Sequence, residues 1–163
     1  PLSIGVGNIS QARSIVNVPN DVLDILQYFP DGSLTIILKA IEPLDPRLGG
    51  YKVAIRFLAD KNAKRLLEKT GPLTATSANK SGVGPLLNCK EAANILTTPE
   101  NKVMGHSGEC LDKIPSTLIS WHTVSETLEL SNIDILREGI VSSKEILKWW
   151  MKQTSSNGET LDT

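Results

Sequence analysis

The sequence lacks the features that would place it in a membrane, a secretory pathway or a common enzyme class. Its longest aliphatic run is residues 36–38, far below the roughly 20 apolar residues of a membrane-spanning helix. No signal-peptide pattern opens the chain. It contains no Walker loop, G-x-G-x-x-G, H-E-x-x-H or G-x-S-x-G motif, and no internal repeat. We therefore expect a cytoplasmic protein without membrane association.

Cysteine is also scarce, and the chain has no excess of positive charge. Cys89 and Cys110 have neither C-x-x-C nor metal-ligand spacing, so we interpret them as reduced thiols, with a disulfide as the less favoured alternative. The formal net charge is −1, which argues against a general nucleic-acid-binding protein, because that role needs enough lysine and arginine to neutralise several phosphates.

What is present is the composition of an ordinary globular protein. The 163 residues are 40% hydrophobic and 21% charged, which predicts one α/β domain with a sizeable core over residues 1–152 and a disordered polar tail over 153–163. The run at 34–38 is expected to be a central strand buried on both faces. The other predicted strands are 2–6, 53–58, 73–76, 102–104, 117–121, 127–130 and 133–136. Helices are predicted at 10–16, 20–29, 61–70, 89–96 and from 143.

Residues 71–82, G-P-L-T-A-T-S-A-N-K-S-G, are the first candidate for a ligand site. Strand-forming residues lead into small and turn-forming ones, which let a bound molecule approach the backbone. Exposed donors at a strand end suit phosphate oxygens. On residue types alone, an ordinary strand followed by a polar loop is the alternative.

Arg56 is the second candidate because it lies within a strand pattern. It falls on the opposite face from Val53, Ile55 and Phe57, where an arginine on a solvated face is the alternative. Asp60 is expected to cap the next helix. Strand, helix and strand 73–76 then form a βαβ-like unit with polar groups near its strand ends. A lone His106 in a loop is interpreted as a surface residue.

Five segments occur in the order found in the YrdC-like family, the threonylcarbamoyl-AMP synthases that begin synthesis of threonylcarbamoyladenosine in tRNA. Residues 72–82 resemble the family's P-L-x-x-T/P-S-A-N-x-S-G signature. Similar segments are F-P-D-G-S-L-T-I-I-L at 29–38, V-A-I-R at 53–56, P-S-T-L-I at 115–119 and I-L-R-E-G at 135–139. The resemblance covers residues 1 to about 148 and implies a twisted open sheet of mixed parallel and antiparallel strands flanked by helices.

The resemblance implies a nucleotidyltransferase that forms threonylcarbamoyl-AMP from L-threonine, bicarbonate or carbon dioxide, and ATP, with Mg²⁺ on the phosphates. Weak RNA binding and a downstream complex that transfers the threonylcarbamoyl group to tRNA are the further partners implied. The chemistry needs no protein nucleophile and no metal-ligating side chain, since the protein orients substrates and offsets charge. By match of motif, ATP would be bound by Ser77, Arg137 and Lys52, and L-threonine by Arg56, Ser116 and Ala75, with Asn79 supporting the loop. Ser77 and Arg137 are expected to meet the phosphates at the ends of adjacent strands.

Departures from the family pattern leave two alternatives open. Gly5, Lys52 and Pro85 differ from the residues usual in the family, and a threonine-and-tyrosine loop and a K-x-R motif are expected before Pro1. We therefore interpret the sequence as a fragment that is nearly inactive alone. One alternative is a catalytically impaired RNA- or protein-binding module. The other is a domain of a hydrogenase-maturation carbamoyltransferase, although those proteins are much longer.

Overall fold

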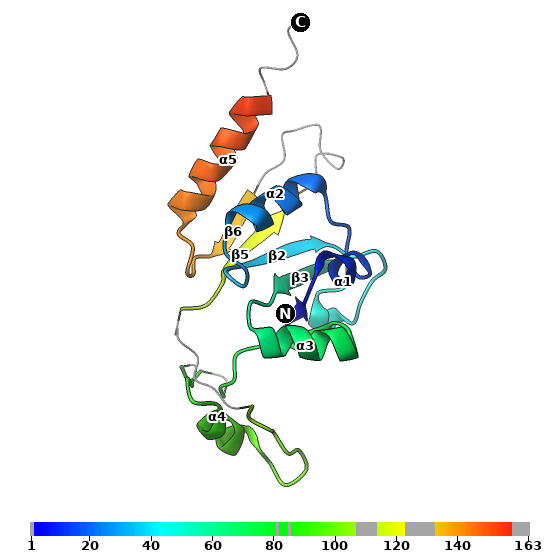
Figure 1. Cartoon of the computed structure of the whole chain (residues 1–163), viewed down its shortest axis with the longest axis vertical. Coiled ribbons are helices and arrows are strands. Elements are labelled where there is room, and N and C mark those ends of the chain that lie inside the picture. The colour runs from blue at the N-terminus through cyan, green and yellow to red at the C-terminus, as the bar shows by residue number, and fades with distance from the viewer. Residues whose placement is uncertain (1, 81, 85, 107–113, 123–132, 158–163) are drawn as a thin grey trace, which may run out of the picture.

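A mixed six-stranded sheet organises the protein. The computed structural model describes residues 2–80, 82–84, 86–106, 114–122 and 133–157, with side chains described as far as Gln153. The strand order is β4-β1-β3-β2-β5-β6 (Figure 1). Neighbours β1 and β3, and β2 and β5, run parallel, and the other neighbouring pairs run antiparallel. The strands are β1 (Ser3–Val6), β2 (Leu34–Lys39), β3 (Lys52–Phe57), β4 (Leu73–Ala75), β5 (Thr117–Trp121) and β6 (Ile133–Arg137).

The helices begin close to the positions that the capping residues predicted for their first turns. The Asp60 side chain accepts the Ala63 N–H at 2.9 Å at the start of α3. At the start of α5, Ser142 and Glu145 form a reciprocal capping box. The described helices are α1 (Ile9–Arg13), α2 (Asn20–Tyr28), the 3₁₀ turn η1 (Pro46–Leu48), α3 (Lys61–Thr70), α4 (Cys89–Leu96) and α5 (Ser143–Asn157). The α/β class and the open mixed sheet flanked by helices are confirmed.

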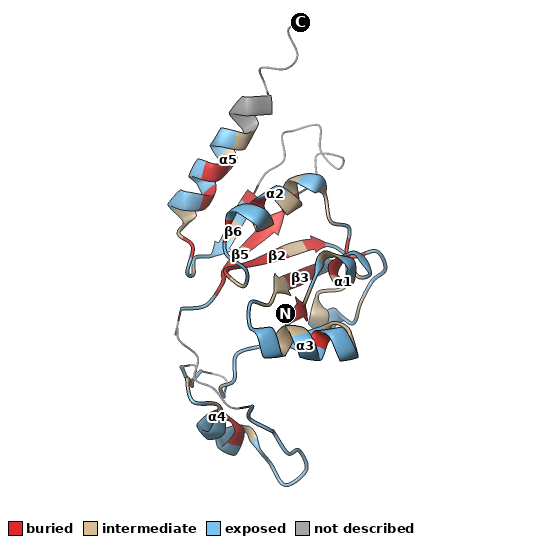
Figure 2. Cartoon of the chain, viewed as in Figure 1, coloured by how far each residue is buried: buried red, intermediate tan, exposed pale blue. Residues whose placement is uncertain are grey.

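The two faces of the sheet differ in chemistry because side chains alternate along each strand. One face forms the core with residues of α1, α2 and α5, and its buried strand residues appear in red in Figure 2. These strand residues are Ile4, Val6, Leu34, Ile36, Leu38, Val53, Ile55, Ile119, Trp121 and Ile133. The alternate positions point the other way and are mostly small or polar. We call this the polar face; it carries Ser3, Gly5, Thr35, Ile37, Ala54, Arg56, Leu118 and Ser120.

Three local predictions are wrong. Strand β4 pairs antiparallel with β1, so β3, α3 and β4 do not form a parallel βαβ unit. Residues 102–104 form no strand, because both backbone groups of Val103 bond to Thr97 Oγ1 rather than to a neighbouring strand. Helix α5 continues to Asn157, so residues 153–157 of the predicted tail are helical. The predicted strand 127–130 and residues 158–163 lie outside the described residues.

Helix α4 and its flanking loops lie apart from the sheet, at the lower end of Figure 1. Only Ala92 and Ala93 of this helix are buried. Gly105 packs against the helix start so closely that a Cβ there would lie 2.5 Å from the Cys89 carbonyl oxygen. Among the described helices, none has the length and apolar character needed to cross a bilayer.

Candidate functional site

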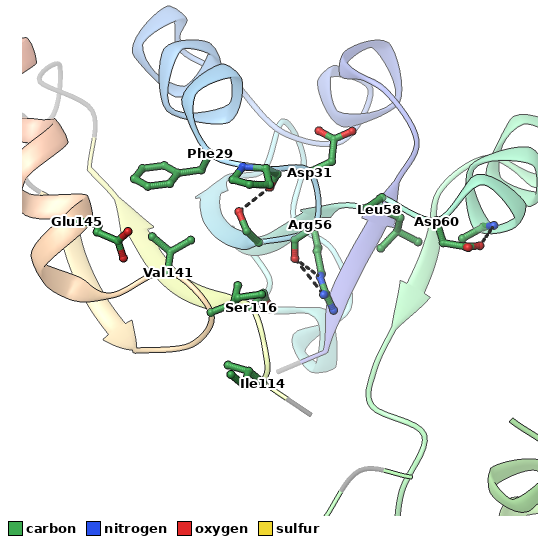
Figure 3. A pocket seen from close by; sticks show the side chains of 15 residues that line it. Phe29, Asp31, Arg56, Leu58, Asp60, Ile114, Ser116, Val141 and Glu145 are labelled. Carbon is green, nitrogen blue, oxygen red and sulfur yellow. Dashed lines mark hydrogen bonds between the residues drawn. The ribbon is translucent and has the colours of Figure 1, made fainter. Parts of the chain in front are cut away.

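A cavity of about 540 Å³ lies where three strand ends meet the segment that precedes α5 (Figure 3). The last residues after β3 and the residues before β2 and β5 form its walls, so segments far apart in the sequence converge there. Its lining includes Phe29, Gly32, Ser33, Arg56, Leu58, Ile114, Ser116, Ile140 and Val141. Two of the predicted threonine-binding residues, Arg56 and Ser116, therefore share one cavity.

Arg56 enters the cavity from β3 as a half-buried cation. Its Nε and Nη2 both donate to the carbonyl oxygen of Gly32, at 3.2 and 3.0 Å (Figure 3). Burial lowers the pKa of Arg56, and the positive charge of Arg137 lowers that pKa further. In the described part of the chain no carboxylate forms an ion pair with either guanidinium. Arg56, a half-buried cation without an ion pair, suits an anionic ligand, and the exposed Arg137 adds a second positive charge beside it.

Ser116 reaches the same cavity from the residue before β5. Its Oγ lies 2.7 Å from Thr35 Oγ1, and both side chains are buried. Thr35 in turn pairs directly with Arg56 across β2 and β3. Thr35 is absent from the sequence-based site, although it belongs to the F-P-D-G-S-L-T segment; its hydroxyl could have been noticed as a polar group inside an apolar run.

Arg137 lies at the end of β6, beside this pair, because of a β-bulge. Ile119 pairs with Ile135 on the core face, whereas the preceding Leu118 pairs with Arg137, so Leu136 is an extra residue in β6. If β6 alternated regularly through Leu136, Arg137 would lie on the same face as Ile135, which is the core face. The bulge instead places Arg137 opposite Leu118, on the polar face, and its Nη2 donates to the Ser116 carbonyl oxygen at 2.9 Å.

The remaining predicted residues do not line the cavity. Lys52 is exposed at the start of β3, on the polar face and paired with Lys39 of β2. Ala75 ends β4, and its carbonyl oxygen accepts from Ser3 Oγ at 2.7 Å. Asn79 Nδ2 bonds to carbonyl oxygens within its own loop, and Ser77 is exposed.

The strand order separates Ser77 from Arg137. We expected them at the ends of adjacent strands, but β4 and β6 are the two edges of the sheet. Cross-strand pairing places Arg137 level with Leu73, the first residue of β4. Strand β4 then runs away from that level, and Ser77 follows Leu73 by four residues. The adjacent-strand expectation is therefore wrong. The structure brings Arg56, Ser116 and Arg137 together and leaves the 77–79 turn beyond the opposite edge.

The cavity offers charge and hydroxyl groups rather than a metal centre. Among the described residues, no group of three or more histidine, cysteine or acidic side chains could hold a metal ion. Three carboxylates also line the cavity, but Asp31 pairs with Lys64, Asp60 caps α3 and Glu145 accepts from Ser142. The chemistry at hand is recognition of an anion by Arg56 and the hydroxyl of Ser116, with apolar walls from Phe29, Leu58 and Ile140.

A protein-family model named for Sua5, YciO and YrdC, and described as telomere recombination, matches residues 1–139. The comparison with curated proteins found no match.

Solved structures of similar fold were found. Sua5 of P. abyssi, in a crystal structure complexed with L-threonine, has a TM-score of 0.72 at 25% identity over 91% of this chain and 42% of its own. YciO of E. coli has a TM-score of 0.64 at 22% identity over 88% of this chain and 68% of its own. The MTH1692 protein of Methanobacterium thermoautotrophicum has a TM-score of 0.61 at 28% identity, covering 85% and 63%. The chain thus spans less than half the length of P. abyssi Sua5.

Proposed function

The chain belongs to the Sua5, YciO and YrdC family, and from this membership and its cavity we propose that it serves threonylcarbamoyl-AMP synthesis. The substrates would be L-threonine, bicarbonate or carbon dioxide, and ATP. The product would supply threonylcarbamoyladenosine modification of tRNA in the cytoplasm, through a downstream transfer complex. That P. abyssi Sua5 was crystallised with L-threonine supports this choice of amino acid.

One observation carries the proposal: two guanidinium groups and a buried hydroxyl pair meet without a carboxylate partner in the described residues. Arg56 and Arg137 repel each other, which contributes to the lowered pKa of Arg56. An anionic ligand would offset this repulsion and the cost of burial. Threonine brings a carboxylate and ATP brings phosphates, so the two substrates could pair with the two guanidinium groups.

The proposed roles follow from the free donors. Arg56 uses Nε and one Nη2 hydrogen on Gly32, which leaves three N–H groups for a carboxylate. The Ser116 hydroxyl would bind the same substrate, and Arg137 would hold phosphate. The threonine amine, carboxylated to a carbamate, would attack the α-phosphate of ATP, and pyrophosphate would leave. The protein's contribution is orientation and charge balance.

The other site residues enter as part of this proposal through motif resemblance. Ser77 and Lys52 would contact ATP, Ala75 would face L-threonine, and Asn79 would hold the turn. Mg²⁺ would arrive with the ATP phosphates as part of that substrate, and we assign it no side-chain ligand. Weak RNA binding on the polar face is a secondary expectation.

Binding is the first test, because titration probes the cavity directly and does not depend on the rate of turnover. We expect calorimetric titration to detect both L-threonine and ATP, and the doubly substituted Arg56→Ala/Arg137→Ala chain to lose both. Arg65→Ala, which removes an exposed arginine from α3, is the matched control. Threonine-dependent pyrophosphate release with labelled bicarbonate then tests turnover. Wild-type protein that binds neither substrate would refute the proposal, and binding without release would favour a binding module.

A further inference from the structure

Thr117, the first residue of β5, carries a fully buried hydroxyl to which the proposed function gives no role. Its Oγ1 donates to the Val141 carbonyl oxygen at 2.5 Å. The same Oγ1 accepts the N–H groups of Gly139 and Val141, at 3.0 and 3.1 Å. A hydroxyl has one donor and two acceptor positions, so every hydrogen-bonding position of Thr117 is spent on the segment after β6.

The same segment lies directly on the backbone that carries Ser116. Ile140 N–H donates to the Pro115 carbonyl oxygen at 2.9 Å, and Arg137 Nη2 donates to the Ser116 carbonyl oxygen at 2.9 Å. A Cβ at Gly139 would lie only 2.2 Å from the Pro115 carbonyl oxygen. The Arg137 end of β6 and the Ser116 end of β5 are therefore joined by several hydrogen bonds, three of which involve the Thr117 hydroxyl.

The hydrogen bonds around Thr117 hold β6 in place against the electrostatic repulsion between Arg137 and Arg56. The two guanidinium groups of Arg56 and Arg137 interact unfavourably, as the lowered pKa of Arg56 indicates. Arg137 is the last residue of an edge strand and is exposed; its backbone pairs with Leu118, and its guanidinium donates to the Ser116 carbonyl oxygen. Loss of the buried Thr117 hydroxyl would loosen this end of β6 and let the repulsion move Arg137 away from Arg56.

We propose that Thr117 is a positioning residue that holds Arg137 beside Arg56 and Ser116, and so joins the phosphate-binding and carboxylate-binding halves of the site. The identity of the two ligands rests on the proposed function, whereas the positioning itself rests on the hydrogen bonds of Thr117. The Ser116 carbonyl oxygen accepts from Arg137, so Ser116 contacts both halves of the site. We therefore expect a ligand bound at the Ser116 hydroxyl to favour binding of a second anion at Arg137.

The first test needs no ligand. Thr117→Val keeps the shape of the side chain and removes the hydroxyl, whereas Thr117→Ser keeps the hydroxyl. Thr70→Val is the matched control, because Thr70 bonds only within the end of α3. We expect amide hydrogen exchange at Gly139 and Val141 to accelerate by roughly tenfold or more in the valine variant. Exchange should stay near wild type in the serine variant and the control. Unchanged exchange in the valine variant would overturn the proposal.

The second test is a double-mutant cycle with Arg137→Ala, read by ATP titration in the presence of L-threonine. If Thr117 positions Arg137, removing Arg137 should weaken ATP binding by roughly tenfold or more in the wild-type background, and by less than about threefold once the Thr117 hydroxyl is gone. A structural role alone would lower stability but leave the Arg137 penalty equal in both backgrounds, and that equality would refute the positioning role.

The proposed function and the positioning role of Thr117 can be refuted by different results. If wild-type protein binds neither ATP nor L-threonine, the proposed function is wrong. The same cycle is then run with inorganic pyrophosphate as the anion probe. Non-additive loss of pyrophosphate binding, together with faster exchange at Gly139 and Val141, would still support positioning by Thr117. Equal Arg137 penalties, or no pyrophosphate binding to wild type, would refute it.

Discussion

Replacing Arg56 with alanine is the sharpest perturbation of the proposed site. The Arg56 guanidinium holds the Gly32 carbonyl oxygen with its Nε and Nη2 and keeps three N–H groups for a ligand. A charge-assisted fork to a carboxylate contributes about 1.5–3 kcal/mol, so its loss should raise the dissociation constant of L-threonine by roughly ten- to a hundredfold. ATP should weaken less, because Arg137 remains and is relieved of a repelling neighbour.

Stability should change little in the same variant, and this separates a ligand-binding role from a structural one. Alanine loses two hydrogen bonds to Gly32, but it also removes a half-buried cation repelled by Arg137. These effects oppose each other, so the net change should stay within about 1 kcal/mol, or roughly 4 °C in Tm for a chain of this size. Arg56→Lys should recover only part of the threonine affinity, because an ammonium cannot form the two-pronged contact.

Calorimetric titration with each substrate and a melting curve, run on wild type, Arg56→Ala, Arg56→Lys and the exposed control Arg65→Ala, decides the question. Selective loss of threonine binding at an unchanged Tm is the expected result. Equal loss of both ligands with a clearly lowered Tm would mean that Arg56 supports the fold, and the assignment of the carboxylate contact would be abandoned.

Three further changes test neighbouring parts of the molecule. Gly139→Ala places a methyl group against the Pro115 backbone, and titration should show ATP binding weakened by roughly tenfold or more. An unchanged ATP affinity would show that the backbone around Gly139 can shift to make room. Asp60→Ala removes the cap of α3 and should cost about 0.5–2 kcal/mol in denaturant unfolding; no loss would mean that water replaces the cap. Hydrogen bonds from Ser142 and Ser143 lower the pKa values of Glu145 and Glu138, so the stability they contribute is present above their unfolded pKa near 4.5 and is lost as pH falls through the lower folded values. The free energy of unfolding of the Glu138→Gln/Glu145→Gln chain, followed by tryptophan fluorescence, should therefore fall less steeply than that of wild type between about pH 5 and 3. An equally steep fall in both chains would contradict the cause assigned to the pKa shifts.

Much of the fold could be predicted because the information is local. The continuous apolar run around Ile36 predicted a buried interior strand, and β2 is an interior strand with mostly buried residues. Alternation along β3 predicted that Arg56 faces away from the core residues Val53 and Ile55, as it does. Asp60 and Ser142 predicted helix starts because capping depends only on the next few residues.

The rest depends on pairing between distant segments, which one sequence does not reveal. Strand residues around Leu73 do not say whether β4 joins an edge or which way it runs, so its antiparallel pairing with β1 was missed. Val103 has strand-forming character but no neighbouring strand, and its backbone bonds to Thr97 instead. Thr35 was not predicted as a site residue, because its hydrogen-bond partner, Ser116, lies 81 residues away in the sequence.

The bulge at Leu136 has a consequence for how this protein tolerates changes of length. In a paired strand, a one-residue deletion reverses the face of every residue beyond it. Leu136 is an exception, because it is the extra residue of the bulge: after its deletion Arg137 follows Ile135 directly and still lies opposite Leu118, on the polar face. We expect this deletion to change the Tm about as much as Leu136→Ala does, because both remove the same exposed side chain and neither turns Arg137 toward the apolar face. In β6 the bulge is therefore the position at which the strand can lose one residue without changing the face of the residues that follow.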